Sequence, residues 1–140
     1  MAKLFKSLKV DPVVDARYFA AVFKFSGAVE VKVFPSPEMP LKWLQQAVGG
    51  HIEIVRGVGL PEGGLLVVND EGLLLRLPFN PVASFLYSAG NAPIVGDAVV
   101  CCDFDPRTPI FEPDAYAAPL LWMRSFLDRL GCLRSAVLIE

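Results

Sequence analysis

The chain has 140 residues, of which 54% are hydrophobic and 20% charged, and its formal net charge is −2. A domain of this length can bury a hydrophobic core without disulfides or metal ions. The small negative charge argues against a nucleic-acid-binding protein, which usually carries a basic patch. Because a surplus of apolar residues often marks a contact surface, we expect a protein partner or self-association.

Cysteine usage and hydropathy bear on the location of the protein. Three cysteines, an odd number, do not indicate a disulfide framework, so we expect free thiols in a reducing compartment. The N-terminal residues include no apolar run that would predict a signal peptide. The uncharged stretch over residues 77–96 is interrupted by prolines and asparagines, which does not favour a membrane span. These features predict a cytoplasmic protein that does not insert in a membrane.

In chain order, residues 1–17 are expected to form a flexible lead-in, and two strands follow over residues 18–25 and 28–34. The strands flank Ser26-Gly27, where glycine favours a tight hairpin turn. The second strand alternates valines with charged residues, which indicates one buried face. The first strand is apolar on both faces, which predicts burial on both sides.

A helix is predicted next, from Pro40 to the Gly49-Gly50 pair. Proline is favoured in the first turn of a helix, and glycine is favoured just after the last turn. Residues 51–55 then predict a short strand. One apolar stripe runs along this helix and comprises Leu41, Leu44 and Val48.

The following pair of strands is predicted over residues 65–68 and 73–77, joined by the turn Asn69-Asp70-Glu71-Gly72. Asn, Asp and Gly are residues that tight turns prefer. Both arms are nearly continuous apolar runs, which is typical of strands buried on both faces. We therefore expect a second hairpin in the centre of the sheet.

The rest of the chain predicts two helices and two strands. Asn80 followed by Pro81 indicates the N-cap and first residue of a helix that ends near residue 88. The later elements are a strand over residues 98–104, an irregular segment over 105–117, a helix over 119–130 and a strand over 133–139.

Together these elements predict an α+β fold in a single domain, residues 1–140. Two β-hairpins and further strands are expected to form a mixed, mostly antiparallel sheet, and about three helices to pack on it. Residues 105–140, with their helix and strand, are expected to be a C-terminal elaboration.

Four blocks of the sequence are distinctive in combination: the helix and strand over residues 41–55 with their Gly49-Gly50 and Ile52-Glu53 pairs, the turn at 69–72, the Leu77-Pro78-Phe79-Asn80 segment and the strand start at Gly96-Asp97. Taken together, they resemble the domain of unknown function family 3846. The resemblance covers residues 18–102. Members of that family are small proteins of bacteria, phages and other mobile elements, so the resemblance implies an accessory role in a mobile element. It implies no activity, cofactor or set of functional residues.

No group of residues has the spacing of a catalytic site. The chain has one histidine, His51, and lacks a Gly-x-Ser-x-Gly motif, so we expect no enzymatic activity. The carboxylates between residues 97 and 114 match no calcium-loop spacing. We therefore expect neither a metal ion nor a cofactor.

Four residues are candidate binding residues. Trp43 lies beside the apolar stripe of its helix, where its ring would face a groove or an interface. Glu71 is the residue of its turn that the backbone geometry does not explain, and loop tips often bind partners. Asn80 and Asp97 stand at the start of a helix and of a strand, and would line a pocket between the sheet and the helix over residues 81–88.

Two functions stay open at this point. The first is a non-enzymatic accessory protein of a phage or mobile element, which acts by protein–protein interaction or self-association. The alternative is a protein that binds or sequesters a small molecule, such as a nucleotide.

Overall fold

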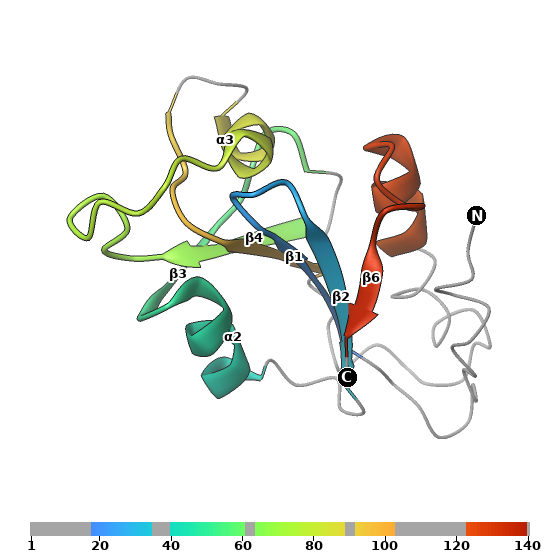
Figure 1. Ribbon diagram of the computed structural model, residues 1–140, viewed down its shortest axis with the longest axis horizontal. Helices are drawn as coiled ribbons and strands as arrows, with labels where there is room; N and C mark the ends of the chain where they lie inside the picture. The colour runs from blue at the N-terminus through green and yellow to red at the C-terminus, as the bar shows by residue number, and fades with distance from the viewer. Residues whose placement is uncertain (1–17, 35–39, 61–63, 89–91, 103–122, 140) are drawn as a thin grey trace.

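The computed structural model describes residues 18–34, 40–60, 64–88, 92–102 and 123–139. These residues form a six-stranded sheet in the order β3-β4-β5-β1-β2-β6, with three helices packed on it (Figure 1). All neighbouring strands pair antiparallel except β6, which runs parallel to β2. The predicted α+β class and mixed, mostly antiparallel sheet are confirmed. The strands are Tyr18–Phe23 (β1), Val29–Phe34 (β2), Ile52–Val55 (β3), Gly64–Asn69 (β4), Ala98–Cys102 (β5) and Val137–Ile139 (β6), and the helices are Leu41–Val48 (α2), Pro81–Ser88 (α3) and residues 123–129.

The predicted first hairpin is confirmed in β1 and β2. Its turn is closed by two backbone hydrogen bonds, from the Lys24 N–H to the Ala28 carbonyl and from the Gly27 N–H to the Lys24 carbonyl, each 2.9 Å long. Gly27 has a φ of 96°, a conformation that glycine adopts without strain. The sequence Ser26-Gly27 therefore fixes the register of β1 against β2.

β1 contributes to two hydrophobic cores, one on each face of the sheet, because its side chains alternate between the two faces. Phe19, Ala21 and Phe23 face the core that α3 and the 123–129 helix cover. Ala20 and Val22 face the core that α2 covers. Figure 1 shows α2 on one side of the sheet and the other two helices on the opposite side. Burial of β1 on both faces was predicted correctly.

α2 packs against β3, β4 and β5, so it covers only part of its face of the sheet. The helix ends where Gly49, with a φ of 82°, donates its N–H to the Gln45 carbonyl. Leu44 and Val48 are buried as the stripe predicted, whereas Leu41, the first residue of the helix, is exposed. On this face β6 adds a further exposed residue, Val137.

The predicted second hairpin is wrong in one arm. β4 forms as expected, but residues 73–77 are not a strand; residues 70–76 form a series of turns instead. The reason is that β4 already pairs with β3 on one side and β5 on the other, so neither edge of β4 is free for a following strand. The second antiparallel pair of neighbours in sequence is instead β3 and β4.

The described part of the C-terminal region follows the prediction. Residues 123–129 are helical, and Gly131 beyond them has a φ of 72°. The final strand is shorter than predicted, because residues 133–135 are in a turn. The predicted lead-in at 1–17 and irregular segment at 105–117 lie outside the described residues. Among the described helices, none has the length and apolar character needed to cross a bilayer.

Candidate interaction surface and a charged hollow

Three consecutive leucines lie exposed between β4 and α3. The exposed fractions of Leu73, Leu74 and Leu75 are 68%, 84% and 53%. We call residues 70–77 the leucine turn. The sequence predicted these side chains in a buried strand, whereas the structure places all three in contact with solvent.

Backbone hydrogen bonds close the leucine turn at several points. The Leu75 N–H donates to the Glu71 carbonyl at 2.9 Å, and the Leu77 N–H donates to the Gly72 carbonyl at 3.1 Å. Arg76, with a φ of 54°, is the one described non-glycine residue with a positive φ. This local turn separates the exposed leucines from Leu77, whose side chain is half-buried against Gly96. The leucines are therefore presented by an ordered backbone.

Glu71, a predicted binding residue, is exposed within the leucine turn. Its backbone N–H donates a hydrogen bond to the side-chain oxygen of Asn69 at 2.8 Å. The Asn69 amide also donates to the Val48 carbonyl at the end of α2, at 3.0 Å. Asn69 thus joins α2 to the turn and sets the direction in which the chain leaves β4.

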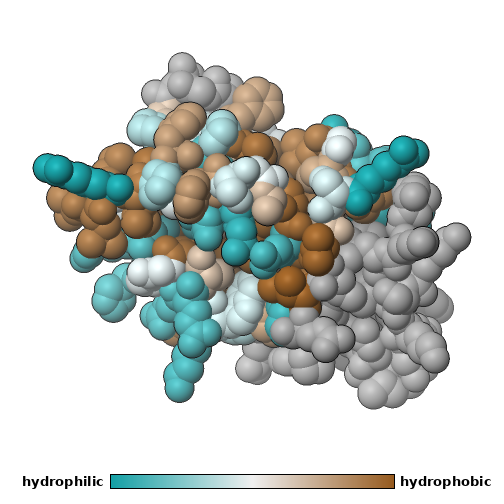
Figure 2. All heavy atoms as spheres, viewed as in Figure 1, coloured by the Kyte–Doolittle hydropathy of each residue, from teal (hydrophilic) through white to brown (hydrophobic). Residues whose placement is uncertain are grey.

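Exposed aromatic and aliphatic residues continue the apolar surface into α3. Phe79, Val82 and Phe85 are exposed and follow at intervals of three residues, so they share one side of the helix and of the segment before it. Val95 links them to the leucine turn, because it pairs with Phe79 and a Cβ on Gly72 would lie 2.8 Å from its Cγ2. Figure 2 shows apolar side chains gathered over the segment between β4 and α3. The apolar surface comprises Leu73, Leu74, Leu75, Phe79, Val82 and Phe85.

Asn80, another predicted binding residue, is fully buried. Its side-chain oxygen accepts the Ala83 N–H at 3.1 Å, which confirms the predicted N-cap of α3. Its amide group donates to the carbonyls of Phe23 and Gly96 at 2.8 and 2.9 Å. The side chain therefore serves the fold beneath the apolar surface, and no part of it reaches solvent.

Trp43 and Asp97, the other two predicted residues, both line a hollow on the α2 side of the sheet. The hollow has a volume of about 270 Å³ and lies between α2 and the β1–β2 hairpin. The predicted pocket around Asn80 and Asp97 adjoined α3; the hollow lies on the opposite face and excludes Asn80. Its lining consists of Val22, Lys24, Glu30, Trp43, Gln46, Ala47, Asp97 and Ile139.

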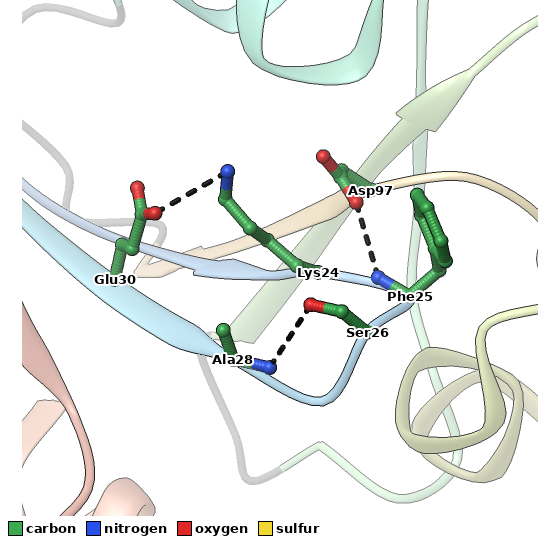
Figure 3. A network of polar contacts seen from close by, with 6 residues as sticks. All are labelled: Lys24, Phe25, Ser26, Ala28, Glu30 and Asp97. Atoms are coloured by element: carbon green, nitrogen blue, oxygen red, sulfur yellow. Dashed lines mark hydrogen bonds and ion pairs between the residues drawn. The ribbon is translucent and has the colours of Figure 1, made fainter.

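Aromatic and polar contacts fix the walls of the hollow. Trp43 packs edge-on against Phe34, with ring centroids 5.0 Å apart and an interplanar angle of 73°. Asp97 Oδ1 accepts the Phe25 N–H at 3.0 Å, and Lys24 Nζ lies 3.3 Å from Glu30 Oε1. Figure 3 shows the three charged groups projecting to the side of the hairpin on which α2 lies.

The other reactive or metal-binding side chains of the described residues do not form a site. Burial raises the pKa of the Cys132 thiol above its ordinary value, an effect partly offset by a backbone hydrogen bond. Such a thiol is a weaker nucleophile at neutral pH, since the thiolate is the reactive form. In the described ranges, no three or more His, Cys, Asp or Glu side chains come together to hold a metal ion.

The four predicted residues thus divide between two places. Trp43 and Asp97 line one hollow, while Glu71 is exposed in the leucine turn and Asn80 is buried at the start of α3. The sequence did not predict that Leu73, Leu74 and Leu75 are exposed. The available signal was the unbroken apolar run after an acidic turn, which lacks the alternation of a half-buried strand, but a run of this kind is equally typical of a buried strand.

Comparison with known proteins gives one match. A family described as Domain of unknown function (DUF3846) matches residues 23–111, more than half of the chain. The matched segment begins at the last residue of β1 and includes both the leucine turn and most of the hollow. No curated protein and no solved structure matches the chain.

Proposed function

The chain belongs to the domain of unknown function family DUF3846, and from that premise we propose that it is a non-enzymatic accessory protein of a phage or mobile element that acts by contact with another protein molecule. The mobile-element context comes from the family resemblance. The same context, together with the free thiol of Cys132, supports a cytoplasmic location as part of this proposal. The contact itself is supported by the exposed apolar surface.

The observation that carries this proposal is the exposure of three adjacent leucines on an ordered turn. Burying one leucine side chain stabilises a protein or a complex by about 1.5–3 kcal/mol. Isolated exposed apolar residues are common, but contiguous ones mark contact surfaces. Here the leucines are followed by the exposed Phe79, Val82 and Phe85, and phenylalanine is among the residues enriched at protein interfaces.

Self-association is the form of contact that can be tested with the purified chain. Sedimentation velocity over a range of concentrations should show dimers or larger species for the wild type. Leu74→Ser should weaken this association by roughly tenfold or more, because about 1.4 kcal/mol corresponds to one factor of ten. Leu41→Ser, the same change at an exposed leucine on α2, is the matched control and should leave association unchanged.

A contact with a different protein predicts another result. The wild-type chain would then sediment as a monomer, and a protein retained by the wild-type chain from its native host would be lost with Leu74→Ser and kept with Leu41→Ser. A monomer that retains no protein, or one whose partner is indifferent to Leu74, would contradict the proposal.

The alternative function, small-molecule binding, is supported by the hollow beneath α2. Its volume of about 270 Å³ falls below the roughly 300–1,000 Å³ typical of pockets for larger ligands. Its formal charge is negative, with Lys24 against Glu30 and Asp97, so the phosphates of a nucleotide would be repelled. These two properties favour a ligand that is small and positively charged.

A further inference from the structure

We propose that the hollow between α2 and the β1–β2 hairpin binds a single organic cation, a guanidinium or primary ammonium group carried on a short aliphatic stem. This inference deepens the alternative function above. It does not depend on the leucine turn, because the hollow and the apolar surface share no residue.

The charge of the hollow argues for a cation. Lys24 and Glu30 face each other at 3.3 Å and compensate one another. Asp97 is different: one of its oxygens accepts the Phe25 N–H, and no cationic side chain of the described residues lies within ion-pair distance. Figure 3 shows its second oxygen turned away from that amide and toward the α2 side. Asp97 therefore leaves one uncompensated negative charge in the hollow.

The walls of the hollow suit the stem of such a cation. Val22, Ala47 and Ile139 supply apolar surface, and Trp43 supplies an aromatic ring. Long basic side chains pack their methylene groups on apolar surface while the charged group stays polar. A cation placed over the face of an indole ring gains further electrostatic stabilisation, and tryptophan is the aromatic residue that provides most of it.

The two recognising groups are held in place before any ligand arrives. Asp97 follows Gly96, which has a φ of 78°, and is tied to the hairpin by the Phe25 N–H. Trp43 is fixed by its edge-on contact with Phe34. Because preorganised groups lose little conformational entropy on binding, a small ligand can bind measurably in a shallow site.

The test uses NMR spectra of the full-length, ¹⁵N-labelled chain titrated with three probes. Agmatine presents a free guanidinium compound, N-acetyl-arginine-N-methylamide presents the same group as a peptide side chain, and N-acetyl-citrulline-N-methylamide is its neutral counterpart. The indole N–H signal of Trp43, assigned with Trp43→Phe, should shift with a cationic probe and not with citrulline. A shift with agmatine alone would indicate a free small-molecule cation as the ligand. A shift with the blocked arginine would indicate a basic side chain of another protein.

Two variants separate a specific site from general attraction. Asp97→Asn keeps an oxygen for the Phe25 N–H and removes the charge, so binding should fall at least tenfold. Gln46→Lys, an exposed change on the rim, should also weaken binding. Asp70→Asn, an exposed change in the leucine turn, is the control and should bind as the wild type does.

The outcomes that overturn the inference are distinct from those that bear on the leucine turn. Absence of any shift at Trp43, equal binding of the citrulline probe, or full binding by Asp97→Asn would refute the cation site. Leu74→Ser should bind the cationic probe normally, whatever its effect on protein contacts.

Discussion

The side-chain amide of Asn80 donates a 2.8 Å hydrogen bond to the backbone carbonyl of Phe23, which lies 57 positions earlier in the chain. The second N–H of the same amide reaches the Gly96 carbonyl, and the side-chain oxygen caps α3 through Ala83. One buried side chain therefore connects the end of β1, the segment before β5 and the start of α3. The connection fixes α3 and the apolar surface relative to the sheet.

Replacing Asn80 with alanine should destabilise the fold strongly. The change removes an N-cap and the hydrogen bonds that Asn80 donates to two backbone carbonyls, for an expected loss of about 2–4 kcal/mol in the free energy of unfolding. Asn80→Asp keeps the capping oxygen but turns a second oxygen toward both carbonyls, so it should destabilise at least as much. Urea unfolding followed by circular dichroism measures both; a loss below 1 kcal/mol for either would show that the connection is weak.

Two leucines that both lie in apolar runs of the sequence, Leu66 and Leu74, should differ strongly in the stability lost when each is changed to alanine. Leu66 is fully buried in β4, so Leu66→Ala should cost about 2–5 kcal/mol of unfolding free energy. Leu74 is exposed, so Leu74→Ala should change that free energy by no more than about 0.5 kcal/mol. The comparison is made by chemical denaturation at a concentration at which the chain is monomeric. Equal losses would mean that Leu74 is packed inside the protein.

Gly57 should be far less tolerant of alanine than Gly27. A Cβ on Gly57 would overlap the Leu86 carbonyl oxygen, where the 57–59 loop also donates hydrogen bonds to Leu86 and Tyr87. Gly57→Ala should therefore cost at least about 3 kcal/mol, the upper range for overpacking. Gly27 has open space around it and only a positive φ, so Gly27→Ala should cost about 1–2 kcal/mol. Thermal unfolding of the pair checks this order, and the reverse order would contradict the close contact of the loop with α3.

We expect the folded chain to lose stability in alkaline solution because of Cys132. Burial raises the pKa of its thiol in the folded chain, and the thiol group contacts the Leu127 carbonyl at 3.6 Å. The unfolded chain therefore loses this proton at a lower pH than the folded chain does. The contribution of the neutral thiol is full below the unfolded pKa and is lost as the pH rises through the raised folded value. Cys132→Ala should show a flatter decline of the unfolding free energy at alkaline pH, and an identical decline would rule out this thiol as the cause.

Local sequence signals predicted most of the elements correctly, because each has a cause within a few residues. Gly27 and Gly49 adopt the positive φ that their turns require, and Asn80 caps the helix that Pro81 begins. The apolar residues on both faces of β1 correctly predicted a strand buried on both sides. These are short-range requirements of the backbone and of the hydrophobic pattern.

The leucine turn could not be predicted in the same way. Residues 73–77 have the composition of a buried strand, and only the arrangement of the sheet shows that β4 has no free edge for them. The hollow was equally hidden, because it brings together Lys24, Trp43 and Asp97 from three separate parts of the chain. Trp43 and Asp97 were each suggested by their own position, but their proximity is a property of the strand order.

Site-specific photo-cross-linking at Leu74 tests the proposed protein contact most directly. The photoreactive residue p-benzoylphenylalanine is incorporated at Leu74, or at Leu41 as the control, in chains expressed in the native host, and adducts are identified by mass spectrometry. The proposal predicts one dominant protein adduct at Leu74, either a second copy or a different protein, which is absent at Leu41 and disappears when Leu73 and Leu75 are changed to serine. Irradiation that yields no adduct at Leu74, or the same adducts at both positions, would contradict it.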